Sequence, residues 1–137
     1  MLKNGAITWS LKKQHLVALS STESEYIAQT HAAKEALWLK SFFEEVDGES
    51  RDAMEVHCDN QGAIVLAKDN KFHSRTKHIN LCYHFLREAV EDGKILMKYI
   101  PTLDNVADIF MKALPRPRFV ELAKRLGLEE KTRGVGE

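Results

Sequence analysis

AMEVHCD (residues 53–59) is a short, largely apolar stretch that ends in an acidic residue, and QGAIVLAKD (residues 61–69) follows it almost directly. The first stretch is typical of a buried strand, and the second predicts a short helix. KILMKYI (residues 94–100) has the same strand-like enrichment and stops at Pro101. Strands that alternate with helices favour an α/β layer fold in which the later strands pair in parallel.

The other elements follow from apolar spacing and from turn residues. Residues 6–20 hold two short apolar runs separated by KKQ, which indicates one bent strand or a hairpin. Thr22 predicts the start of a helix, and Gly93 and Gly127 suit the left-handed position past a helix end. The stripe expected to face the core from the first helix comprises Ala28, Ala32, Ala36, Leu39, Phe43 and Val46. The further helices are expected over residues 79–93, 104–114 and 119–126.

Composition limits the class of protein. The chain has 137 residues, 44% of them hydrophobic, which is enough for one domain with a real core. We expect residues 1–128 to form this domain and residues 129–137 to form a flexible tail. Basic and acidic residues balance at 20 each, so a charged partner must be recognised by a local patch. Without a membrane span or a signal-peptide core, we expect an intracellular protein that makes no membrane contact.

Cysteine and aromatic residues are expected in the core. Cys58 and Cys82 both lie in apolar segments, which favours reduced, packed thiols. Histidines lie near them, but no pair has the usual spacing of a structural zinc site, and we expect no structural zinc. The aromatic residues expected in the core or at its edge are Trp9, Trp38, Phe42 and Phe43.

Three acidic residues stand where a strand is expected to hand over to a helix: Glu25, Asp59 and Asp108. They are separated by 34 (59 − 25) and 49 (108 − 59) residues. Parallel strands would bring all three to one edge of the sheet, where open α/β folds bind ligands. Clustered carboxylates repel one another unless a cation neutralises them, and Mg²⁺ is the usual cation. Two such ions would activate water and stabilise the leaving oxygen of a phosphodiester.

The same three residues also fit ordinary helix caps. Thr22 and Glu25 have the spacing of a capping box. Asp59 could be a plain N-cap, and Asp108 stands three positions after a potential cap at Asn105. Spacing alone therefore leaves both a shared metal site and three independent caps open.

The segment from Lys68 to His78 is locally basic. Its charged side chains give a local charge of +3 (4 − 1), from Lys68, Lys71, Arg75 and Lys77 against Asp69. Such a segment suits contacts with phosphates that position a duplex without reading its sequence. A run of charge is also typical of solvated surface, and this alternative stays open.

Four blocks of the sequence resemble a known family. They are ITWSLKKQHLVALSSTESEYIA (residues 7–28), VHCDNQGAIVLAKD (56–69), FHSRTKHINLCYHFLREAVEDGKILMKYIPT (72–102) and NVADIFMKALPRPRF (105–119). In order and spacing they look like the ribonuclease H domain that closes the Pol polyprotein of copia-type LTR retrotransposons. The resemblance covers residues 5 to 128 and is far stronger than any single motif.

The resemblance implies a three-layer α/β fold with a mixed sheet, and cleavage of the RNA strand of an RNA/DNA hybrid. Ribonucleases H hold two Mg²⁺ ions with four acidic residues, and Glu25, Asp59 and Asp108 match three of them. The same carboxylates accept Mn²⁺. Glu23 remains a surface cap or a group behind the ligands. The implied partners are the hybrid and the upstream reverse transcriptase part of Pol, in the cytoplasm or in virus-like particles.

The resemblance also implies a nucleic-acid surface and a departure from the family. The residues expected at that surface are Lys71, His73, Arg75, Lys77, His78, Asn60 and Gln61. The family's first two strands, and the first catalytic aspartate on them, have no counterpart here. We therefore expect an N-terminally truncated domain that is inactive by itself. The alternatives are a non-catalytic remnant that still binds nucleic acid and a partly folded fragment of Pol.

Overall fold

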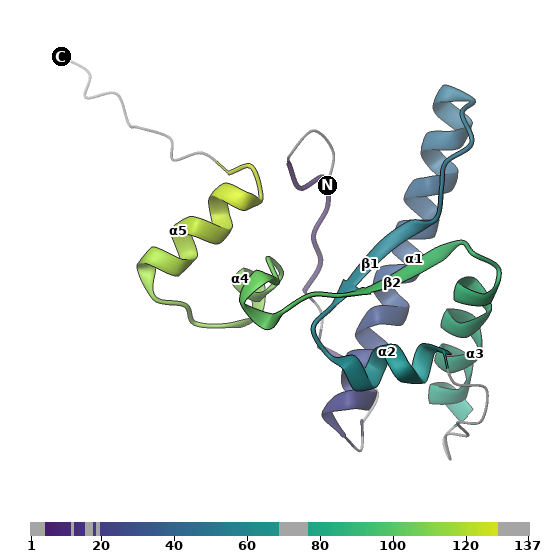
Figure 1. Ribbon diagram of the computed structural model, residues 1–137, viewed down its shortest axis with the longest axis horizontal. Coiled ribbons are helices and arrows are strands. Elements are labelled where there is room, and N and C mark those ends of the chain that lie inside the picture. Colours follow the sequence, from purple (N-terminus) through teal and green to yellow (C-terminus); the bar gives the residue numbers. More distant parts are fainter. Residues whose placement is uncertain (1–4, 12, 16–17, 19, 69–76, 129–137) are drawn as a thin grey trace. The chain divides into compact units, whose positions relative to one another are not determined.

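The computed structural model describes residues 5–11, 13–15, 18, 20–68 and 77–128 (Figure 1). The chain divides into two compact units. The larger is His15–Leu103, and the smaller combines Met1–Gln14 with Asp104–Glu137.

The larger unit holds a two-stranded parallel sheet. Strand β1 (Met54–Cys58) pairs with β2 (Ile95–Tyr99), so that Met54 lies opposite Ile95 and Cys58 opposite Tyr99. Beyond the last pair, the Ile100 N–H donates to the Cys58 carbonyl at 2.9 Å. Both strands and their parallel pairing agree with the sequence prediction. Helices combined with a small parallel sheet are compatible with the α/β class.

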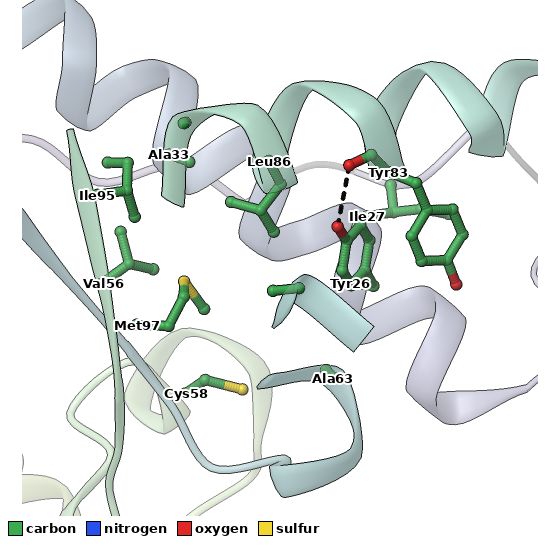
Figure 2. Packing of buried hydrophobic residues seen from close by; sticks show 12 residues of the cluster. Tyr26, Ile27, Ala33, Val56, Cys58, Ala63, Tyr83, Leu86, Ile95 and Met97 are labelled. Atoms are coloured by element: carbon green, nitrogen blue, oxygen red, sulfur yellow. Dashed lines mark hydrogen bonds between the residues drawn. The ribbon is translucent and has the colours of Figure 1, made fainter. Parts of the chain in front are cut away.

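Three helices pack on one another and on the sheet: α1 (Ser21–Asp47), α2 (Gln61–Lys68) and α3 (Lys77–Glu91). Figure 2 shows the side chains that the strands direct toward them. The strand residues on this buried face are Val56, Cys58, Ile95 and Met97. The alternate residues Glu55, His57, Leu96 and Lys98 are exposed, because side chains alternate between the two faces of a strand.

Two tyrosines close the core between α1 and α3. Tyr26 is fully buried, and its ring lies 4.2 Å from the Tyr83 ring, centroid to centroid. The Tyr26 hydroxyl donates to the Tyr83 carbonyl oxygen at 3.3 Å (Figure 2). Burial raises the pKa of Tyr26 far above its usual value and that of Tyr83 to about 12, so both hydroxyls stay protonated at neutral pH.

The N-cap of the first helix lies two residues before the predicted one. Ser20 has extended backbone angles, and its side-chain oxygen accepts a hydrogen bond from the Glu23 N–H at 3.1 Å. Ser20 and Glu23 have the same three-residue spacing as Thr22 and Glu25. The prediction of Thr22 as the cap is therefore wrong, because the earlier of two equally spaced pairs is used. The helix ends at Gly48, whose φ of 72° is the left-handed conformation that glycine adopts most easily.

The predicted core stripe of this helix is wrong for three of its six residues, whereas Ala36 packs against the core and Leu39 and Phe43 are partly buried. The residues that α1 buries are Tyr26, Ile27, Gln29, Thr30 and Ala33, whereas Ala28, Ala32 and Val46 are exposed. Apolar spacing missed this face because two of its residues are polar. The Thr30 hydroxyl is satisfied inside the core, since it donates to the Tyr26 carbonyl at 3.0 Å.

The second half of α1 extends past the strands (Figure 1). Its aromatic side chains are more exposed than expected, with Trp38 at 60% and Phe42 at 46%. These two rings stack on each other, while Phe43 is partly buried and faces the Arg51 guanidinium at 5.2 Å. Trp9 is also exposed. The prediction of core or core-edge positions therefore fails for Trp9, Trp38 and Phe42 and agrees with the structure for Phe43.

No helix in the described part of the chain is long and apolar enough to cross a membrane.

The smaller unit contains α4 (Asp108–Met111) and α5 (Arg116–Arg125), and a 3₁₀ turn (Thr102–Asp104) follows β2. The helix predicted over residues 104–114 is thus a single α-helical turn. The Asn105 side chain accepts the Ala107 N–H at 3.1 Å, a local bond that competes with helix formation. Gly127 ends α5 with a φ of 77°, as predicted.

The strand or hairpin expected over residues 6–20 is not found in the described residues of that range, which form no strand. The Ala6 N–H donates instead to the Leu126 carbonyl at 3.0 Å, just past the end of α5. A strand exists only where a neighbouring strand satisfies its backbone groups, and apolar enrichment alone does not supply that neighbour.

Two leucines on α3 test the position of the core. Leu86 is fully buried, whereas Leu81 on the same helix is 62% exposed. We expect Leu86→Ala to lower the free energy of unfolding by about 2–5 kcal/mol, because it leaves a cavity in the core. The matched control Leu81→Ala should change it by less than about 0.5 kcal/mol. Urea unfolding followed by circular dichroism measures both, and equal losses would contradict this core.

Candidate functional site

Asp59 stands at the carboxyl end of β1, one residue before Asn60, and α2 begins at Gln61. The Asn60 side-chain oxygen accepts the Ala63 N–H at 3.1 Å, the bond that a helix N-cap makes. Asn60 rather than Asp59 therefore caps α2. The Asp59 carboxylate is partly buried and makes no hydrogen bond or ion pair with the described residues. It is left available to a ligand.

Glu25 lies in the second turn of α1 and is partly buried. The N-cap of this helix is Ser20, whose side chain accepts the Glu23 N–H. Glu25 thus sits next to the buried Tyr26, at the end of α1 that faces the start of α2.

The first turns of α1 and α2 pack closely beside the end of β1. A Cβ atom at Gly62 would lie 3.4 Å from Thr22 Cγ2 and 3.2 Å from Asn60 Oδ1. Glycine therefore allows the two helices to approach at this point without moving the Asn60 cap. The approach brings the helix that carries Glu25 to the turn that carries Asp59.

The charges of both carboxylates affect the pKa of the Cys58 thiol. Burial is the main cause that raises its pKa, the Asn60 N–H lowers it, and the negative charges of Glu25 and Asp59 raise it further. The thiol therefore stays protonated at neutral pH.

Two neighbouring carboxylates at this position suit a divalent cation. Like charges 4 Å apart repel by about 4 kcal/mol at an effective dielectric constant of 20. The positive ends of the α1 and α2 dipoles offset part of this repulsion. Mg²⁺ is commonly held in proteins by one or two carboxylates together with water and substrate phosphates. The donor set of Glu25 and Asp59 therefore fits Mg²⁺.

Asp108 belongs to the smaller unit, where it opens α4. Its carboxylate is 15% exposed and forms an ion pair with Lys112 at 2.8 Å. The N-cap of this short helix is Ala107, so Asn105 does not cap it in the way the spacing allowed. No group of three histidine, cysteine or acidic side chains suited to a metal occurs among the described residues. The structure thus places Glu25 and Asp59 on elements of the larger unit that pack against each other, and a site shared by the acids stays a prediction.

Most of the residues expected to contact nucleic acid lie outside the part of the chain that the structure describes. Lys71, His73 and Arg75 fall outside the described residues, as do the side chains of Lys77 and His78 at the start of α3. Of the other two, Asn60 is engaged as the α2 cap and Gln61 is exposed beside it.

Sequence reasoning missed one residue of this site. Gln29 is buried, and its side-chain amide donates to the Cys58 sulfur at 2.5 Å. Its position four residues after Glu25 was the available signal, because residues four apart share one face of a helix.

These features define an α/β unit with Asp59 at the carboxyl end of a parallel strand and Glu25 on the helix that packs beside it. The sequence comparisons give the family context. Over 122 residues, 89% of the chain, it is 47% identical to the retrovirus-related Pol polyprotein from transposon TNT 1-94 of Nicotiana tabacum. Over the same length it is 38% identical to the Pol polyproteins from transposons RE2 and RE1 of Arabidopsis thaliana. The homologues of this chain are therefore copia-type retrotransposon Pol polyproteins.

The chain spans only a small part of these relatives. The matched region is 9% of the tobacco protein and 8% of each Arabidopsis protein. No family model matches the chain. No solved structure matches it either. The homology thus supports a Pol-derived segment without assigning it to one activity of Pol.

The cap assignment at this site can be tested with two neighbouring substitutions. Asn60→Ala removes the acceptor of the Ala63 N–H and should lower the free energy of unfolding by about 1 kcal/mol. Asp59→Ala removes a side chain without a bonding partner here and should change it by less than about 0.5 kcal/mol. Thermal unfolding of the two variants and the wild type measures the difference. The opposite ranking would show that Asp59 is the cap.

Proposed function

We propose that this chain is part of a ribonuclease H-type domain that hydrolyses the RNA strand of an RNA/DNA hybrid. The observation that carries the proposal is the packing of α1, which carries Glu25, against the start of α2 beside Asp59, in a chain whose homologues are Pol polyproteins. Asn60 rather than Asp59 caps α2, which supports a role for Asp59 other than capping.

The proposal assigns Mg²⁺ to this carboxylate pair, with Mn²⁺ as an alternative ion. Glu25 and Asp59 would hold the cation, and the resemblance adds Asp108 and a fourth acidic residue from a preceding segment of Pol. A bound cation supplies charge neutralisation and an activated water for phosphodiester hydrolysis. The chain contributes the geometry, because the two helix starts and the strand end fix where the carboxylates lie.

The proposal also includes two partners. The basic segment from Lys68 to His78 would contact phosphates of the hybrid, an interaction that weakens steeply as salt increases. The reverse transcriptase part of Pol would adjoin this segment of the polyprotein. The 89% match to a 9% portion of the tobacco relative supports a chain that works within a longer protein.

Cleavage of a labelled RNA/DNA hybrid in Mg²⁺ tests the proposed activity. Two proteins are compared: the chain itself and the chain fused to the segment that precedes the matched region in the tobacco relative. We expect the fused protein to cut the RNA strand. Asp59→Asn in that protein should slow cleavage by about 100-fold or more, because a preorganised charge at the reacting phosphate is lost.

Asp52→Asn is the matched control for this experiment. Asp52 is exposed and precedes β1, at the opposite end of the strand from Asp59. The same loss of charge there should leave cleavage unchanged. A fused protein that binds the hybrid but does not cut it would favour the non-catalytic remnant. Full cleavage by the Asp59→Asn protein would overturn the assignment.

A further inference from the structure

Gln29 is a polar residue in the middle of the apolar core. Its side chain is 5% exposed, and its amide nitrogen donates to the Cys58 sulfur at 2.5 Å. The amide oxygen has no hydrogen-bond partner among the described residues. A buried amide is costly when it is not bonded, so the single contact with the thiol fixes how this side chain lies.

The thiol in turn holds the backbone around Asp59. The Cys58 sulfur accepts the Asn60 N–H at 3.2 Å and donates to the Asn60 carbonyl at 3.4 Å. These two bonds close a tight turn whose central residue is Asp59. Asn60 also caps α2 through its side chain, so the same turn sets where that helix begins. The conformation at Asp59 therefore depends on the sulfur.

Gln29 lies one helical turn after Glu25, on the same face of α1. A continuous chain of contacts thus runs from the Glu25 segment through Gln29 and the Cys58 sulfur to the turn at Asp59. The amide and the thiol thus form a polar contact between the helix and the end of the strand.

We propose that Gln29 is a positioning residue, whose contact with Cys58 sets the separation of the Glu25 and Asp59 carboxylates. The inference rests on the proposed function, since it concerns the same cation site. In this role the buried amide and the thiol do not bind the cation themselves, but hold in place the segments that carry the two carboxylates. A residue with only a packing role would affect stability alone, whereas a positioning residue also changes cation affinity.

The test is the affinity of the chain for Mn²⁺, measured by electron paramagnetic resonance without nucleic acid or turnover. Gln29→Leu keeps the approximate size of the side chain and removes the amide. We expect it to weaken Mn²⁺ binding by about 10-fold or more, as substitutions behind metal ligands commonly do. The control Val56→Ala loosens the core on the same strand without touching this contact. It should change the affinity by less than about twofold.

Asp59→Asn separates failure of this inference from failure of the proposed function. If the wild type does not bind Mn²⁺, or Asp59→Asn binds it equally well, both the site and the inference are wrong. If Asp59→Asn weakens binding and Gln29→Leu does not, the site is retained and the positioning role is wrong.

A second variant covers the case in which Gln29→Leu does not fold. Cys58→Ala removes the sulfur that both the Gln29 amide and the Asn60 N–H contact, while the side chain at position 29 is unchanged. We expect it to bind Mn²⁺ more weakly than the wild type, by about 10-fold or more. Unchanged affinity in the folded Cys58→Ala protein would overturn the proposal.

Discussion

Parallel pairing of β1 with β2 is the constraint on which the larger unit depends. Parallel neighbours cannot be joined by a tight turn, so the chain between them must cross over one face of the sheet. Here α2 and α3 form that crossover, and α1 packs beside them. The buried face of the strands, with Val56 and Ile95, then has three helices to pack against. The candidate site arises where this crossover begins.

The position of the carboxylates follows from the same geometry. A crossover that leaves the carboxyl end of β1 must begin α2 close to that end, and α1 starts against the first turn of α2. Two helix starts and one strand end thus meet at Asp59. The partial positive charge of helix N-termini favours anions there and lessens the cost of holding Glu25 near Asp59. The Cys58 sulfur and the Gln29 amide occupy the space between the helix and the strand.

Sequence patterns predicted the elements of this unit well, because their signals are local. The strand ending at Cys58, the strand beginning at Ile95 and the left-handed glycine at 93 all agree with the structure. Each depends on residues within a few positions of one another. The position of Asp59 at the carboxyl end of a parallel strand was accessible in the same way.

Predictions that depended on distant partners were less successful. The α1 stripe was chosen by apolar spacing, but Gln29 and Thr30 occupy the buried face, where the Gln29 amide nitrogen contacts Cys58 and the Thr30 hydroxyl donates to the Tyr26 carbonyl. The strand expected over residues 6–20 needed a neighbouring strand that apolar content does not specify. The two alternative capping boxes at Ser20 and Thr22 have equal spacing, so only the fold distinguishes them.

The claim that Glu25 and Asp59 form one cation site can be tested most directly by nuclear magnetic resonance with traces of Mn²⁺. Paramagnetic broadening falls off steeply with distance, so it locates the bound ion on the chain. The account requires the first amide signals lost to lie around Glu25 and around Asp59 together. The acidic end of α1, with Glu44, Glu45 and Asp47, offers a competing surface for cations. Broadening confined to that end, with Glu25 and Asp59 unaffected, would contradict the central claim.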